Sequence, residues 1–288
     1  MNEPAGWSGV AGKRILITGA TDGIGLAAAE ALAAKGAKLA LTARSEDKAR
    51  AALEKIKAAA GGKADVDILS ADLSSMAAVR KCAAEALSRY PRIDILVNNA
   101  GAMYPDRRLT KEGLEQTWAV NHLAVFLLTE LLLERLKNSA PARIITTSSG
   151  AHRRADAIPF DDLNADRSYA EFPRYSETKL ANVLFTRELA RRLEGSGVCA
   201  ACFHPGTVAT GFGRDSTGFM RIGLWIARPV FRTPEKGAET LVWLCETPEV
   251  RSGGYYLDLK ETPISAAAQD DAAARRLWDV SVQQTGSA

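Results

Sequence analysis

The chain has 288 residues, of which 47% are hydrophobic, and its 37 Lys and Arg nearly balance its 34 Asp and Glu, for a formal net charge of +3. The basic residues are scattered, which argues against a nucleic acid or an anionic membrane as partner. Residues 1–12 lack the basic start and apolar run of a signal peptide, and no stretch approaches the roughly 18 apolar residues of a transmembrane helix. We therefore expect a cytoplasmic protein that acts on a small molecule.

Neither the histidines nor the cysteines form a pattern that is typical of a metal site. The three histidines lie far apart, and the only closely spaced cysteines are Cys199 and Cys202. Both belong to an apolar run that is predicted to be a buried strand, where side chains three positions apart point to opposite faces. We expect no metal site and no disulfide framework.

Short aliphatic or β-branched runs alternate with longer amphipathic segments along most of the chain. Most of the short runs are almost continuously apolar, as strands covered by helices on both faces are. The predicted strands are 14–18, 38–42, 65–70, 93–98, 143–147, 198–204 and 254–259. The sequence thus predicts an α/β fold with a doubly wound parallel sheet of the Rossmann type, about seven strands and helices on both faces.

No long linker, repeat or low-complexity tract interrupts the chain, which predicts a single domain over 1–288 with a C-terminal extension at 261–288. Residues 151–174 are mostly polar and irregular, whereas 207–233 are rich in aromatic and aliphatic side chains. Because ligands of open α/β sheets bind beyond the carboxyl ends of strands, we expect both segments to border a substrate pocket, with 207–233 as its lid. The alternative for 207–233 is extra core or a contact in a homo-oligomer.

A glycine-rich loop, Thr18-Gly-Ala-Thr-Asp-Gly-Ile-Gly25, follows the first predicted strand and leads into a helix. Glycines at such a turn allow backbone N–H groups and the helix N-terminus to approach a pyrophosphate. The loop therefore predicts a dinucleotide site. The residues expected to form it are Gly19, Thr21, Asp22, Gly23, Ile24 and Gly25.

The second predicted strand ends in Leu41-Thr-Ala-Arg44 and has no acidic residue at its tip. An acidic residue there would accept a hydrogen bond from an unphosphorylated ribose 2′-hydroxyl, whereas a guanidinium can bind a 2′-phosphate through two parallel hydrogen bonds. Without the glycine loop, Arg44 would be an ordinary exposed arginine. Together with the loop, it favours NADP(H) over NAD(H).

Tyr175-Ser-Glu-Thr-Lys179 places a phenol and an ammonium group at positions i and i+4 of a predicted helix, on one face. A nearby positive charge favours the phenolate, so we expect Lys179 to depress the pKa of Tyr175 and make it a usable proton donor and acceptor. A surface pair of this kind is common. Its position after the strand that ends in Ser148 and Ser149 is what points to catalysis.

A serine hydroxyl at the end of that strand would hydrogen-bond the substrate oxygen while the tyrosine moves the proton. Ser148 and Ser149 both qualify on position. Because neighbouring residues of a strand alternate in direction, only one of them faces the tyrosine.

In their order, these motifs resemble those of the short-chain dehydrogenase/reductase family, and the matches extend from Lys13 to Trp278. The resemblance implies that Ser149 is the catalytic serine, that Tyr175 transfers the proton and that Lys179 tunes it. It also implies that Asn121, in Trp118-Ala-Val-Asn-His122, helps to hold a water next to the lysine.

The same resemblance implies cofactor contacts at three further strand ends, Ala71-Asp-Leu73, Asn98-Asn-Ala-Gly101 and His204-Pro-Gly-Thr-Val208. In the family the first approaches adenine, the second supports the adenosine side and the third contacts nicotinamide. The cofactor residues implied in this chain are Asp72, Leu73, Asn98, Ala100, Gly101, Pro205, Gly206 and Val208, together with Tyr175 and Lys179.

Three longer stretches resemble the retinol dehydrogenase branch of the family. They begin at Asn121, at Lys179 and at Ala268, the last reading Ala268-Gln-Asp-Asp271 before Arg276-Leu-Trp278. Many members of that branch have an N-terminal membrane anchor, and residues 1–12 do not resemble one.

The leading hypothesis is an NADP(H)-dependent oxidoreductase that transfers a hydride between nicotinamide and a carbonyl or alcohol. The apolar segment 207–233 favours a lipophilic aldehyde, ketone or alcohol as substrate. One alternative is reduction of an activated C=C bond on the same scaffold. Another is a sensor or scaffold that binds NADP without catalysis.

Overall fold

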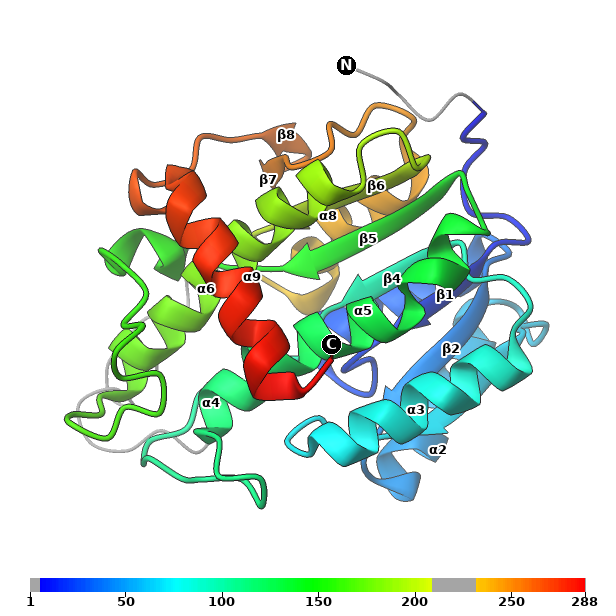
Figure 1. Cartoon of the computed structure of the whole chain (residues 1–288). Helices are drawn as coiled ribbons and strands as arrows, with labels where there is room; N and C mark the ends of the chain where they lie inside the picture. Colours follow the sequence, from blue (N-terminus) through cyan, green and yellow to red (C-terminus); the bar gives the residue numbers. More distant parts are fainter. Residues whose placement is uncertain (1–5, 209–231, 288) are drawn as a thin grey trace.

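A single eight-stranded sheet forms the centre of the computed structural model, which describes residues 6–208 and 232–287. The strand order is β3-β2-β1-β4-β5-β6-β7-β8, and every pair is parallel except β7 with β8 (Figure 1). The strands are β1 (Arg14–Ile17), β2 (Lys38–Ala43), β3 (Val66–Ser70), β4 (Ile95–Asn98), β5 (Ala142–Thr147), β6 (Val198–Phe203), β7 (Tyr255–Leu257) and β8 (Lys260–Glu261).

The predicted fold class is confirmed, and the strand count is eight instead of about seven. The additional strand, β8, has two exposed residues and pairs antiparallel with β7 at the sheet edge. A strand so short has no periodic pattern in the sequence, so it could not be recognised there.

Helices cover both faces of the sheet (Figure 1). One hydrophobic core lies under α1, α2 and α8, and a second lies under α3, α5, α6 and α9. The helices are α1 (Gly23–Ala34), α2 (Glu46–Ala59), α3 (Met76–Arg89), α4 (Gln116–Trp118), α5 (Ala124–Lys137), α6 (Glu171–Arg192), α8 (Pro234–Glu246) and α9 (Asp271–Thr285). Two short helices matter for the site, the π-helical η1 (Ala119–Leu123) and the 3₁₀ η2 (Gly150–Arg154).

The predicted C-terminal extension contains α9, which packs against α5 and α6 (Figure 1). Its Trp278 stacks on Phe185 and meets Phe126 edge to face. The extension is thus part of the second core.

The strand order reverses between β1 and β4, and in open α/β sheets ligands bind beyond the carboxyl ends of the strands at such a point. Most of the predicted lid lies outside the described residues. Its two described ends pair, since Val208 forms a parallel bridge with Arg232. In the part of the chain that the structure describes, no helix is long and apolar enough to cross a membrane.

Candidate active site

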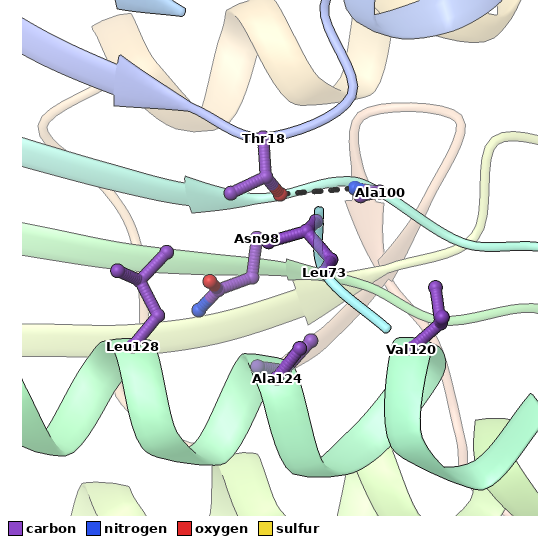
Figure 2. A pocket seen from close by; sticks show the side chains of 8 residues that line it. Thr18, Leu73, Asn98, Ala100, Val120, Ala124 and Leu128 are labelled. Atoms are coloured by element: carbon purple, nitrogen blue, oxygen red, sulfur yellow. Dashed lines mark hydrogen bonds between the residues drawn. The ribbon is translucent and has the colours of Figure 1, made fainter. Parts of the chain in front are cut away.

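The glycine-rich loop after β1 is tied to the turn after β4. The Thr18 hydroxyl accepts hydrogen bonds from the backbone N–H groups of Asn99 and Ala100, each at 3.0 Å; Figure 2 draws the bond to Ala100. In return the Asn99 side chain donates to the carbonyls of Thr18 and Gly19. The loops after β1 and β4 are therefore fixed relative to one another.

Two glycines make this close approach possible. Gly19 has a φ of +67°, and a β-carbon on it would lie 2.8 Å from the Ala100 Cα. A β-carbon on Gly25 would lie 2.3 Å from the Gly19 carbonyl oxygen and 2.5 Å from the Asn99 side-chain nitrogen. The loop leads directly into the N-terminus of α1, where Asp22 caps the Gly23 N–H at 2.8 Å. This cradle of backbone and helix N-terminus fits a pyrophosphate.

Arg44 and Asp72 stand at the ends of the neighbouring strands β2 and β3, at the same edge of the sheet. Arg44 is exposed, and the Asp72 carboxylate accepts from the backbone and hydroxyl of Ser74. Burial raises the pKa of Tyr104. The charge of Arg44 opposes this effect and the charge of Asp72 adds to it, so Tyr104 lies close enough to interact with both. Tyr104 belongs to no motif, so the sequence alone does not indicate it.

The Asn98 side chain is buried on the α5 side of the sheet. Its amide nitrogen donates to the Thr129 hydroxyl of α5 at 2.9 Å, on the face of the sheet below the loop (Figure 2). The gap around it is too narrow to admit a water molecule. The residues that line this gap are Thr18, Leu73, Asn98, Ala100, Val120, Ala124, Val125 and Leu128. Asn98 thus braces the turn after β4 from below, whereas the neighbouring Asn99 contacts the glycine loop.

The structure brings Ser149, Tyr175 and Lys179 together at the carboxyl ends of the central strands. The Ser149 and Tyr175 side chains are hydrogen-bonded. The Lys179 ammonium donates to the Thr147 carbonyl oxygen at 3.2 Å and lies 5.4 Å from the centre of the Tyr175 ring. Tyr175 and Lys179 come from α6, and Ser149 is the N-cap of η2, directly after β5.

Burial dominates the titration of this cluster. It raises the pKa of Tyr175 to about 12, although the hydrogen bond from Ser149 acts in the opposite direction. It lowers the pKa of Lys179 to about 8. The expected depression of the Tyr175 pKa by Lys179 is therefore not found among the protein's own groups, because desolvation disfavours the charged form of both side chains.

Ser148 and Ser149, which directly follow β5, have different environments. The Ser148 hydroxyl is buried and donates to the Lys179 backbone carbonyl at 2.9 Å, whereas Ser149 is hydrogen-bonded to Tyr175. The alternation of a strand separates them, so Ser149 is the serine that faces the phenol.

Asn121 lies in η1 and is fully buried. Its amide forms a pair of 2.8 Å hydrogen bonds with the backbone of Ala102 and donates to Thr178 at 3.1 Å. Gly101 lies next to both Asn121 and Lys179. A β-carbon on it would lie 3.2 Å from the Lys179 ammonium and 3.5 Å from the side-chain carbonyl oxygen of Asn121.

The motif after β6 lies on the same side of the sheet as the glycine loop. A β-carbon on Gly237 of α8 would meet both Val208 and Ile24, so these two predicted cofactor residues are neighbours. Gly206 has a φ of +83°, and its N–H donates to His204 at 3.3 Å. Burial and the charge of Arg232 lower the pKa of His204 to about 4, which keeps the imidazole neutral.

Comparisons with known proteins agree with this geometry. The family model for short chain dehydrogenase matches residues 13–219. Human retinol dehydrogenase 14 is 41% identical over 297 aligned residues, which cover 96% of this chain and 87% of that protein. A protein of Streptomyces sp. (strain C5), provisionally named daunorubicin C-13 ketoreductase DnrU, is 40% identical over 96% of this chain and 94% of its own length.

Solved structures give the same result. A crystal structure of a Mycobacterium paratuberculosis protein has a TM-score of 0.78 and 31% identity, and the match covers 99% of this chain and 97% of the other. L-sorbose reductase from Gluconobacter frateurii, solved with NADPH and L-sorbose, has a TM-score of 0.69 and 26% identity over 86% of this chain and 95% of its own. The chain belongs to the short-chain dehydrogenase/reductase family of oxidoreductases, alongside its retinol dehydrogenase relatives.

Proposed function

We propose that this protein is an NADP(H)-dependent oxidoreductase that converts a lipophilic aldehyde or ketone and the corresponding alcohol into one another. The observation that carries the proposal is the buried cluster of Ser149, Tyr175 and Lys179 beside a glycine-rich loop. A phenol hydrogen-bonded to a serine, with an ammonium one helical turn away, is suited to moving a proton to or from a substrate oxygen.

The loop between β1 and α1 would hold the pyrophosphate of the cofactor, and the segment from Pro205 to Val208 would face its nicotinamide. When bound, NADP(H) supplies or accepts the hydride. With a pKa of about 12, Tyr175 is protonated at neutral pH and serves as the proton donor in reduction. Ser149 orients the substrate oxygen. The Lys179 ammonium, held next to the Tyr175 ring, stabilises negative charge as it develops on the phenol oxygen.

Four observations support the finer parts of the proposal. Arg44 is exposed at the end of β2, where a guanidinium suits a 2′-phosphate, and L-sorbose reductase, a structural relative, binds NADPH. The names of the relatives refer to retinol and to the C-13 ketone of daunorubicin. An apolar molecule also suits the aromatic and aliphatic composition of 212–231. The expected location in the cytoplasm stays a prediction.

The test is a panel of aldehydes, ketones and alcohols, with NADPH, NADH and their oxidised forms, followed by the absorbance of the reduced nicotinamide. Specificity constants are expected to rise along a series of alkanals, by up to about 0.8 kcal/mol for each buried methylene, until the pocket is full. Flat values along the series, or a preference for hydrophilic carbonyls, would refute the lipophilic substrate class but not the hydride transfer.

A second candidate, reduction of an activated C=C bond, uses the same side chains. Including an enone in the panel and identifying its product separates the two reactions, because only one of them yields the saturated ketone. Cofactor binding without turnover on any substrate would favour a sensor or scaffold instead.

A further inference from the structure

A buried ion pair lies next to the proposed catalytic tyrosine. The Arg174 guanidinium donates through Nε to the Glu115 carboxylate at 2.7 Å, and the side chains are 1% and 0% exposed. Arg174 directly precedes Tyr175 in α6, while Glu115 comes from a segment about 60 residues earlier in the chain. The pair therefore joins two distant parts of the sequence at the site.

Glu115 starts the helical segment that carries Asn121. One of its oxygens accepts from the Thr117 N–H at 2.8 Å, and the other accepts from the Trp118 N–H at 2.9 Å. These bonds cap α4, which continues without interruption into η1. The position of Glu115 thus determines where the helix containing Asn121 begins.

Arg174 connects three segments. Besides Glu115, its guanidinium donates to Glu177 on the next turn of α6 and to the Leu163 carbonyl of the loop before α6. Its centre lies 5.1 Å from the centre of the Trp118 ring. The fork of a guanidinium is needed for this, because an ammonium group offers no planar set of donors.

Further hydrogen bonds join the segment before α4 to the loop before α6. The Asn164 side chain accepts from the Glu115 N–H at 3.0 Å and donates to the Gly113 carbonyl at 3.1 Å. The Tyr169 hydroxyl donates to the Tyr104 carbonyl at 2.6 Å. Hydrogen bonds consequently connect the loops around 104–115 and 155–170, and the buried ion pair connects Glu115 to the start of α6.

We propose that Glu115 and Arg174 are positioning residues, which fix the start of α6, and with it the Tyr175 hydroxyl, relative to the helix that carries Asn121. The inference rests on the proposed function. A buried ion pair is weak evidence for stability, since well-packed apolar side chains of similar volume often serve as well or better. A requirement for geometry accounts for the pair, because displacing a reacting group by about 1 Å can cost about 100-fold in rate.

The test compares Arg174→Met, Glu115→Gln and the double variant in the full chain, at a temperature where circular dichroism shows each to be folded. Arg174→Met leaves the carboxylate buried without its guanidinium, so it should be the least stable. The double variant removes both charges and should be more stable than Arg174→Met, although the amide nitrogen introduced at position 115 cannot accept one of the two N-cap hydrogen bonds. If the pair positions Tyr175, kcat should stay about 10- to 100-fold below that of the wild type in the double variant, with the cofactor Kd within about twofold. Recovery of kcat together with stability would overturn the proposal.

Glu188→Gln is the matched control. Glu188 is also nearly buried and pairs with Arg191 and Arg192 on the same helix, about 20 Å along the axis from Tyr175. This variant should leave kcat within about twofold of the wild type, and an equal loss of kcat would show that any ion pair of α6 has the same effect.

Amide hydrogen exchange gives a readout that needs no turnover. In the double variant, exchange should quicken in 116–123 and 171–179 and stay unchanged in 184–192. Unchanged exchange in the first two segments would refute the proposal that the ion pair fixes the two helices relative to one another. If the wild type reduces no carbonyl of the panel, the proposed function fails, and the exchange measurement still decides whether the pair fixes the two helices.

Discussion

The Lys179 ammonium lies 5.4 Å from the centre of the Tyr175 ring, one turn further along α6, and both side chains are nearly buried. Burial disfavours the charged form of each, so at neutral pH the phenol keeps its proton and the lysine holds its own less firmly than usual. Only the lysine therefore carries a buried charge, and this charge would stabilise negative charge that develops on the phenol oxygen.

Tyr175→Phe should keep the ring packing and remove only the hydroxyl that hydrogen-bonds Ser149. Because general acid–base catalysis is worth about 10²- to 10⁴-fold, kcat should fall by that factor, while the cofactor Kd stays within about twofold. Steady-state kinetics and titration of cofactor fluorescence measure the two quantities. A variant with nearly normal turnover would remove Tyr175 from the mechanism.

Arg44→Asp should shift the cofactor preference from NADPH toward NADH by at least about tenfold, because a carboxylate repels a 2′-phosphate. The measurement is the ratio of the two specificity constants. Arg50→Asp is the control, since Arg50 is exposed on α2 and the substitution changes the net charge equally. If the ratio does not change, the phosphate contact lies elsewhere, with Lys13, Lys38 and Lys48 as the next candidates.

The alternation of apolar strands and amphipathic helices was enough to predict the parallel sheet, and β1 to β7 begin and end within two residues of the expected limits, whereas β8 was not predicted. What the sequence could not predict depends on long-range contacts. The apolar side chains of α9 interdigitate with α5 and α6, and nothing local in Ala268 or Ala274 indicates that both are fully buried. Packing partners of a helix are decided by the tertiary fold.

The candidate site was predictable where motifs follow strands, and less so where side-chain direction decides. Ser149 and not Ser148 faces Tyr175, which the family resemblance indicated. Asn98 and Asn99 are adjacent in one motif, yet only Asn99 reaches the glycine loop, and composition does not distinguish them. Likewise, Glu115 lies in no motif that the sequence analysis used.

Ser149→Ala and Ser148→Ala should differ in their effect on turnover. The first removes the hydroxyl that faces Tyr175, so kcat should fall about 100-fold, and it also removes the N-cap hydrogen bond from the Ala151 N–H, which should cost about 0.5–2 kcal/mol of stability. The second removes a buried hydrogen bond to the Lys179 carbonyl, so the protein should lose about 1–2 kcal/mol of stability and keep most of its turnover. Kinetics and urea unfolding of both variants test the assignment. If Ser148→Ala loses turnover and Ser149→Ala keeps it, Ser148 and not Ser149 acts with Tyr175.

Lys179→Met should abolish most of the turnover and at the same time stabilise the fold at pH 7. The ammonium is nearly buried, and its pKa is lowered from 10.5 to about 8. The unfolded chain therefore binds this proton more tightly than the folded protein does, and between pH 8 and 10.5 the wild type gains stability as the pH rises. Below pH 8 the full cost of burying the charge is present.

Methionine has a similar length and no charge, so Lys179→Met should raise the free energy of unfolding by about 2 kcal/mol at pH 7. The advantage should shrink toward zero above pH 10.5, because the wild-type lysine is then neutral in both states. The Thr147 carbonyl loses its hydrogen bond from the ammonium but keeps the 3.4 Å hydrogen bond from Asn182, so this carbonyl contributes little to the change in the free energy of unfolding. Urea unfolding of both proteins at several pH values gives the difference, from which groups common to both cancel. A variant less stable than the wild type by the same amount at every pH would show that the buried ammonium costs the fold nothing.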